Sequence, residues 1–244
     1  MTTFSSFSDL LPDPNNKINS AGATDNTNGD AGPGFAKVKF GSDYQTQVSR
    51  TISGRGVTAS PGYHMWNFSI SYNPMTRDEF EPVASFLESR YGRLKPFYVI
   101  LPQHSAPRNA AFETLCRADL SGITVSGLHG AGTPYIMING VSSGTPMRGD
   151  FLTITDPSDV NHKKAYKVIR VEDNSTYQIG TTQPGTTQRR IWLEPALSRA
   201  VTSGSVVNFI DPKFRVIQKG DTFEYDLDTD GLYQFSLSLE EILP

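Results

Sequence analysis

The fold is decided by residues 64–102, HMWNFSISYNPMTRDEFEPVASFLESRYGRLKPFYVILP. Residues 65–72 alternate apolar and polar side chains, and this period of two predicts a strand with one buried face. Its apolar positions are Trp66, Phe68, Ile70 and Tyr72. Residues 97–101 form a short apolar run, which indicates a second strand. We expect Trp66 and Phe97 to lie in the core.

A helix is predicted between these two strands. Thr76 and Glu79 have the spacing of a capping box, and Gly92 suits the C-terminal cap. Pro82 removes a backbone hydrogen bond, so it shifts the start of the helix or bends it. Between the two caps, one stripe at helical spacing holds the apolar residues Phe80, Val83, Ala84, Leu87 and Tyr91. The pattern predicts a strand–helix–strand unit whose helix covers a sheet.

More strands are predicted on both sides of this unit. Residues 35–40 precede it, followed by residues 44–53, whose alternation is mostly polar. Towards the C-terminus the predicted strands are 213–218, 222–227 and 232–239. We expect these strands to join one sheet with residues 35–101.

The middle of the chain has a different sequence pattern. After a connector at residues 103–116, short strands separated by turns are predicted at 122–128, 134–138, 150–155, 164–172, 176–180, 189–193 and 205–210. Such spacing without helices is typical of a small barrel or sandwich. The prediction is therefore mainly β: an inserted small β-barrel at 118–211 within a discontinuous β domain at 35–117 and 212–244.

Composition excludes several classes of protein. The 244 residues carry a net charge of −3, so no overall field attracts a polyanion such as nucleic acid. No run approaches the roughly 18 apolar residues of a membrane helix, and residues 1–28 lack the features of a signal peptide. The single cysteine, Cys116, forms no internal disulfide and is interpreted as a buried thiol. Residues 1–34 are interpreted as a flexible arm, because 13–34 contain almost nothing to bury.

Catalytic patterns are weak. The histidines, at positions 64, 104, 129 and 162, have no metal-binding spacing, and no GxSxG motif occurs. Residues 53–56, SGRG, favour a β-turn over a phosphate loop. The doublets Lys163–Lys164 and Arg189–Arg190 are interpreted as solvated strand ends. The carboxylates Glu194, Glu224, Glu240 and Glu241 leave a glycosidase open without singling out a pair.

Two further patterns have alternative interpretations. Asp226, Asp228 and Asp230 in DLDTDG match the opening of a calcium loop, but its twelfth position is Leu237 instead of glutamate. A hairpin turn is therefore favoured, and we expect no metal or other cofactor. The aromatic residues Tyr135, Tyr177 and Trp192 suit either sugar stacking or a half-buried barrel wall.

Two stretches resemble bacteriophage tail proteins of the distal-tail, baseplate or tail-tip type. In residues 64–102 the resemblance rests on Trp66, Met75, Thr76, Phe80, Phe86, Leu87, Gly92 and Phe97. In residues 148–212 it rests on RGDFLTI, KKAYKVI, RIWLEPALSRAV and GSVVNF, and the closing YQFSLSLEEIL also fits.

The resemblance implies a tail-tube-like sheet with one flanking helix and a peripheral inserted barrel. It also implies a non-enzymatic virion subunit that forms a six-fold or three-fold ring and contacts the tail tube, hub or tape-measure region. We expect residues 1–34 and the sheet to face neighbouring subunits. A carbohydrate-binding or host-recognition module is the alternative, and a hydrolase acting on cell-wall or capsule sugars is a third hypothesis.

Overall fold

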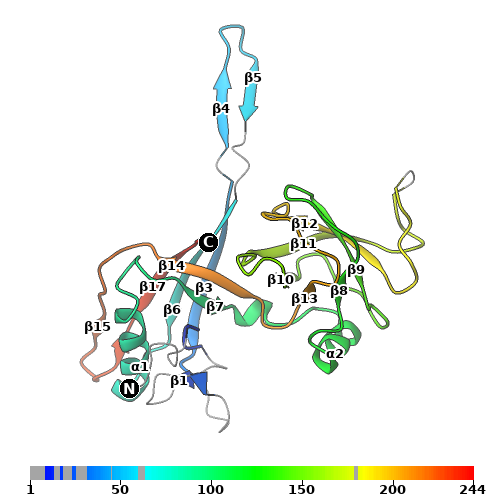
Figure 1. Cartoon of the computed structure of the whole chain (residues 1–244). Helices are drawn as coiled ribbons and strands as arrows, with labels where there is room; N and C mark the ends of the chain where they lie inside the picture. Colours follow the sequence, from blue (N-terminus) through cyan, green and yellow to red (C-terminus); the bar gives the residue numbers. More distant parts are fainter. Residues whose placement is uncertain are drawn as a thin grey trace. The chain divides into compact units, whose positions relative to one another are not determined.

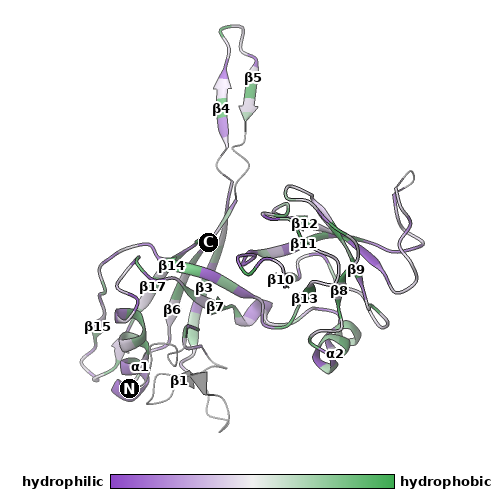
Figure 2. Cartoon of the chain, in the orientation of Figure 1, coloured by the Kyte–Doolittle hydropathy of each residue, from purple (hydrophilic) through white to green (hydrophobic). Residues whose placement is uncertain are grey.

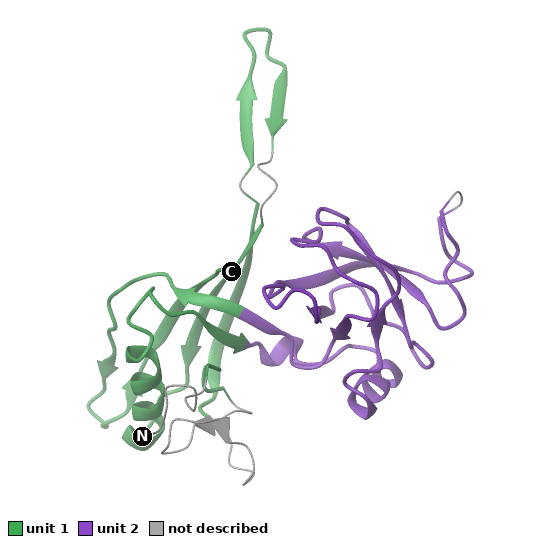
Figure 3. Cartoon of the chain, viewed as in Figure 1, with its two compact units in different colours: residues 1–99, 215–242 green, residues 100–214, 243–244 purple. Residues whose placement is uncertain are grey.

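The computed structural model describes residues 9–13, 17–18, 24–25, 32–44, 46–59, 64–178 and 181–244. The chain is mainly β, as predicted, and it divides into two compact units (Figure 3). Unit 1 comprises residues 1–99 and 215–242, and unit 2 comprises residues 100–214 and 243–244. The first unit is therefore discontinuous in sequence, and the second contains the small closed barrel.

The core of unit 1 rests on a five-stranded sheet (Figure 1). Its strands, in spatial order, are β3 (Phe35–Asp43), β6 (Met65–Tyr72), β17 (Ser236–Glu241), β14 (Lys213–Gln218) and β7 (Phe97–Ile100). The apolar face predicted for β6 is buried along its whole length. Leu237 and Leu239 of β17 lie opposite Ile70 and Phe68 of β6 and are buried with them. Trp66 and Phe97 are both buried, as predicted.

Helix α1 (Arg77–Glu88) forms where the capping box predicts it. The Glu79 carboxylate accepts a hydrogen bond from the Thr76 amide at 2.9 Å. Pro82 lies within the helix. The apolar stripe is buried up to Leu87, but its predicted last member, Tyr91, is exposed and has a φ of 54°. That part of the prediction was wrong, because the helix ends before Tyr91 and the chain there turns into the left-handed region.

Part of the predicted N-terminal arm is bound to its own unit. Leu10 forms a parallel bridge with Tyr98 of β7, and Leu11 is fully buried. The Tyr98 amide donates to the Asp9 carbonyl at 2.7 Å. Farther along, β1 (Lys17–Ile18) pairs with β2 (Thr24–Asp25). Residues 9–13 thus cover the β7 edge of their own sheet, and residues 1–8, 14–16, 19–23 and 26–31 of the arm lie outside the described residues.

Residues 44–53 do not form the single strand that was predicted. Instead, β4 (Gln47–Arg50) pairs with β5 (Gly56–Ala59), and the chain turns between them at residues 51–55. The resulting two-stranded hairpin extends from the ends of β3 and β6 (Figure 1). The prediction missed β5, because Gly54, Gly56 and Pro61–Gly62 around its two β-branched residues were interpreted as breaks. We call residues 46–59 the hairpin arm.

A second hairpin precedes the last strand of the sheet. Within residues 222–239 the structure has β15 (Asp226–Leu227) paired with β16 (Tyr233–Gln234), followed by β17. The predicted strand 222–227 therefore shrinks to two residues, because only Asp226 and Leu227 find a partner. Tyr233 also bridges to Met75, ahead of α1. We call residues 221–234 the acidic hairpin.

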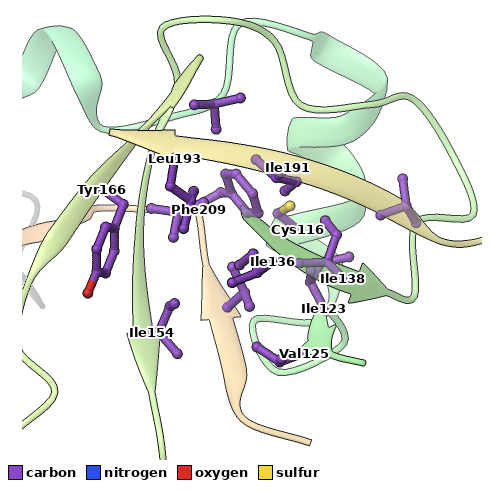
Figure 4. Packing of buried hydrophobic residues seen from close by; sticks show 14 of the residues in the cluster. Cys116, Ile123, Val125, Ile136, Ile138, Ile154, Tyr166, Ile191, Leu193 and Phe209 are labelled. Atoms are coloured by element: carbon purple, nitrogen blue, oxygen red, sulfur yellow. The ribbon is translucent and has the colours of Figure 1, made fainter. Parts of the chain in front are cut away.

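Unit 2 is built on a closed six-stranded barrel, as predicted. Its strands are β8 (Thr124–Val125), β9 (Tyr135–Asn139), β10 (Phe151–Thr155), β11 (Ala165–Glu172), β12 (Arg189–Glu194) and β13 (Val206–Asn208). They close in the order β10-β11-β12-β9-β8-β13 around aliphatic and aromatic side chains (Figure 4). No strand forms at residues 176–178, so that predicted strand was wrong over its described part.

The predicted connector contains regular structure. The 3-10 helix η2 (Pro102–His104) is followed by α2 (Ala110–Ala118), a second helix where only one was expected in the chain. The Asn109 side chain caps α2 by accepting from the Phe112 amide at 3.0 Å. Phe112 and Cys116 of α2 belong to the barrel core. Unit 2 therefore begins at Ile100, ahead of the boundary expected at 118.

Candidate functional site

The turn of the hairpin arm is well ordered by its own hydrogen bonds. The Thr51 amide donates to the Arg55 carbonyl at 3.0 Å, and the Gly54 amide donates to the Thr51 carbonyl at 2.8 Å. The Arg55 amide in turn donates to the Thr51 hydroxyl at 3.1 Å. Gly54 has a φ of 82°, which glycine adopts without strain. The β-turn therefore spans residues 51–54 and includes only the first two residues of the predicted SGRG turn, because Gly56 already belongs to β5.

Every residue of the hairpin arm is exposed to solvent. Three of them are large apolar residues, Val48, Val57 and the fully exposed Ile52. Figure 2 shows apolar and polar residues interleaved along β4 and β5. An isolated two-stranded hairpin is at best marginally stable in water, and its open edges are templates for pairing with another chain. The arm is therefore a candidate contact surface.

The residues next to the arm are packed onto the core of unit 1. Ser42 and His64 form a hydrogen bond of 2.7 Å between Oγ and Nε2. The His64 ring packs edge-on against Trp66 with centroids 4.2 Å apart, and Tyr44 packs against His64 at 4.8 Å. The Trp66 amide donates to the Glu241 carboxylate at 3.1 Å. This chain of contacts links the ends of β3 and β6, next to the arm, to the central strands of the sheet.

The acidic hairpin carries five carboxylates and no basic residue: Asp221, Glu224, Asp226, Asp228 and Asp230. Its turn is closed by the Gly231 amide, which donates to the Asp228 carbonyl at 2.9 Å. The hairpin interpretation of DLDTDG is thereby confirmed. Tyr225 and Leu227 are exposed apolar residues on the same hairpin. A cavity of about 350 Å³ borders it, lined by residues including Glu224, Tyr225, Asp226 and Phe235.

The barrel brings two of the predicted aromatic residues together with a buried ion pair. The rings of Tyr135 and Trp192 lie 5.3 Å apart, and both side chains are half-buried. Trp192 Nε1 donates to the fully buried Glu172 carboxylate at 3.1 Å. Arg190 pairs with the same carboxylate at 2.9 Å and lies over the Tyr135 ring. Tyr177, the third predicted aromatic residue, lies in the turn region after β11.

The four histidines do not converge. His64 is in unit 1, while the others occupy separate places in unit 2: His104 packs against Phe151, His129 accepts from the Met137 amide, and His162 contacts Tyr166. Burial lowers the pKa of His104, His129 and His162. Among the described residues, no group of three histidine, cysteine, aspartate or glutamate side chains is arranged to hold a metal ion.

Cys116 and two of the four candidate carboxylates, Glu240 and Glu241, are held in structural contacts. Cys116 is buried, as predicted, and burial raises the pKa of its thiol to about 11, so it is protonated at neutral pH. Glu240 pairs with Arg93 at 2.8 Å, whereas its neighbour Glu241 is buried against Trp66. Consecutive residues of a strand face opposite sides, so these two carboxylates do not face a common substrate. Glu194 is in β12 and Glu224 lines the cavity of unit 1.

Each of the two basic doublets contains a buried residue. Lys163 is exposed, but Lys164 is almost fully buried, so that doublet is not a solvated strand end. Arg190 is likewise buried by its pairing with Glu172. No helix in the described part of the chain is long and apolar enough to cross a membrane.

Comparisons with known proteins add no identification. The chain matches no protein-family model, and no curated protein matches it.

The two surfaces that stand out, the hairpin arm and the acidic hairpin, were not recognised as sites from the sequence. The sequence offered two signals for these surfaces. One is the mostly polar sequence beside SGRG, and the other is the group of five acidic residues at 221–230, among which no lysine or arginine occurs. In the sequence both surfaces are indistinguishable from ordinary turns. The solvent exposure of Val48, Ile52 and Leu227 depends on the position of the rest of the fold, which the local sequence does not contain.

Proposed function

We propose that the protein is a structural subunit of a bacteriophage tail, forming a ring at the distal tail, tail tip or baseplate. The observation that carries the proposal is the hairpin arm, which exposes all of its residues and, among them, the apolar side chains of Val48, Ile52 and Val57. The resemblance of residues 64–102 and 148–212 to tail proteins supports the same assignment. A ring of six or three copies would bury such an arm between neighbours.

The sheet supports this proposal from its two edges. Residues 9–13 cover the β7 edge, whereas β3 at the opposite edge pairs with β6 alone among the described strands. An open edge next to an exposed hairpin is suited to pairing with another subunit. Contacts of this kind join different surfaces of successive subunits, and such head-to-tail contacts generate rings when the rotation between subunits closes.

Removal of the hairpin arm tests the proposal. We expect the purified full chain to form oligomers of defined size in sedimentation velocity and rings in electron micrographs. A variant in which residues 46–59 are replaced by a short glycine–asparagine turn should remain folded but sediment as a monomer. A full chain that stays monomeric at every concentration, with its arm accessible to protease, would contradict the proposal.

A second candidate function is recognition of host-surface carbohydrate by the barrel. The Tyr135–Trp192 pair offers aromatic faces, and the adjoining Arg190–Glu172 pair fixes their geometry. Aromatic rings and polar groups in this combination are suited to the apolar faces and hydroxyls of sugars. On a glycan array we expect Trp192→Ala to lose binding and Trp192→Phe to retain part of it. Absence of binding by the unmodified protein counts against this function.

A further inference from the structure

We propose that the hairpin arm of one copy docks on the acidic hairpin of the next copy. This inference rests on the proposed ring assembly and names the two surfaces that meet in it. The arm contains Arg50 and Arg55 and no acidic residue, and the acidic hairpin contains five carboxylates and no basic residue. Opposite charges on two exposed surfaces of one chain favour association between copies.

Most of the charges on the two surfaces have no ion-pair partner within the described residues. Among the described residues, Arg50 and Arg55 form no ion pair, and their side chains are exposed. Glu224, Asp226 and Asp230 are also exposed and, within the same residues, outside every ion pair. Partner charges are therefore available on both surfaces when a second copy arrives.

Both surfaces also have open strand edges and exposed apolar side chains that a contact between copies would bring together. In the described part of the chain β15 pairs only with β16, which leaves its outer edge open beside the exposed side chains of Asp226 and Leu227. Among the described residues, strands β4 and β5 likewise pair only with each other. An exposed strand can add to an open sheet edge through main-chain hydrogen bonds. Docking would also remove Val48, Val57 and Leu227 from water.

The cavity beside the acidic hairpin assigns a place to the tip of the arm. Glu224 and Asp226 line it together with the aromatic rings of Phe223, Tyr225 and Phe235. Carboxylates and ring faces are the two partners that a guanidinium prefers. Arg55 lies in the turn of the arm and is the side chain that we place in this cavity.

Charge reversal tests the contact in the full chain. Sedimentation velocity should show that Arg50→Glu with Arg55→Glu weakens association about tenfold or more, and that Glu224→Lys with Asp226→Lys has a similar effect. A chain carrying all four reversals should recover much of the association, because its two surfaces are complementary again. Arg55→Lys, which keeps the charge without the planar fork, should lie between the unmodified protein and the reversal.

Cross-linking tests the direction of the contact. We expect a chain with Ser53→Cys and Thr229→Cys to form a ladder of covalent oligomers with a short bismaleimide. Each single variant should give no ladder, and the unmodified protein, whose Cys116 is buried, should not react. Efficient dimer formation by Ser53→Cys alone would indicate arm-to-arm pairing and overturn the inference.

The two proposals fail in different ways. Oligomers that persist undiminished in both double-reversal variants, without a cross-linked ladder, would overturn the docking contact and leave ring assembly intact. A monomer under every condition would overturn both.

Discussion

Trp66 links the central strand of unit 1 to the base of the hairpin arm. Its side chain is 1 % exposed and lies between the rings of Phe40 and His64, with centroids 4.9 and 4.2 Å away. Its amide donates to the buried Glu241. One residue therefore joins strands β3, β6 and β17, and its loss should be felt beyond its own strand.

Truncation of Trp66 is the first test at this scale. Trp66→Ala should lower the free energy of unfolding by roughly 3–5 kcal/mol, because a large aromatic side chain is removed from a packed core. Met65→Ala, on the exposed face of the same strand, is the control and should cost less than about 1 kcal/mol. Urea unfolding measures both. Equal, small losses would show that Trp66 contributes little to the core.

The pH dependence of the free energy of unfolding tests the role of Asp173. Hydrogen bonds, first from the Ser175 hydroxyl and then from the Ser175 amide and Thr176, lower its pKa to about 2. An aspartate with a lowered pKa stabilises the fold above its unfolded pKa of roughly 4, and this contribution is lost as the pH falls towards 2. Asp173→Asn should flatten the pH dependence of unfolding in that window. An unchanged slope between pH 4 and 2 would contradict this role.

At the scale of elements, the sequence predicted those strands and helices whose signals lie within a few consecutive residues. The β6 strand and helix α1 were found because alternation and a capping box are present in consecutive residues. Helix α2 was missed although Asn109 precedes Phe112 and Cys116 at helical spacing, because nine residues give a short signal. The hairpin arm and the Glu172–Arg190 pair depend on exposure and on residues far apart in sequence, which no local pattern contains.

Substitution of two glycines in unit 2 distinguishes the cost of backbone strain from the cost of steric crowding. Gly140 follows β9 and Gly204 precedes β13, with φ of 91° and 87°. A Cβ on Gly140 would collide with the Gly122 carbonyl oxygen, whereas a Cβ on Gly204 meets open space. Gly204→Ala should cost about 1–2 kcal/mol from backbone strain alone. Gly140→Ala should cost clearly more by thermal or urea unfolding, and equal losses would show that the β8–β9 region adjusts freely.

At the scale of the whole molecule, the barrel and its helix should form one folding unit. Phe112 and Cys116 of α2 contribute to the barrel core, so a chain of residues 102–214 contains the complete core. We expect this chain to unfold in one cooperative thermal transition. A chain of residues 118–211 lacks both side chains and should melt at a lower temperature. Matching melting temperatures would show that α2 adds nothing to the stability of the barrel.

The order of strands in unit 1 has an evolutionary consequence. Strands β7 and β14 are neighbours in the sheet, yet all of residues 101–212 lie between them in sequence. A short reverse turn can join two adjacent strands, so the sheet does not require any particular polypeptide at this junction. Related chains can therefore exchange, enlarge or lose the intervening module by recombination at a single seam, while the strands that flank it keep their register.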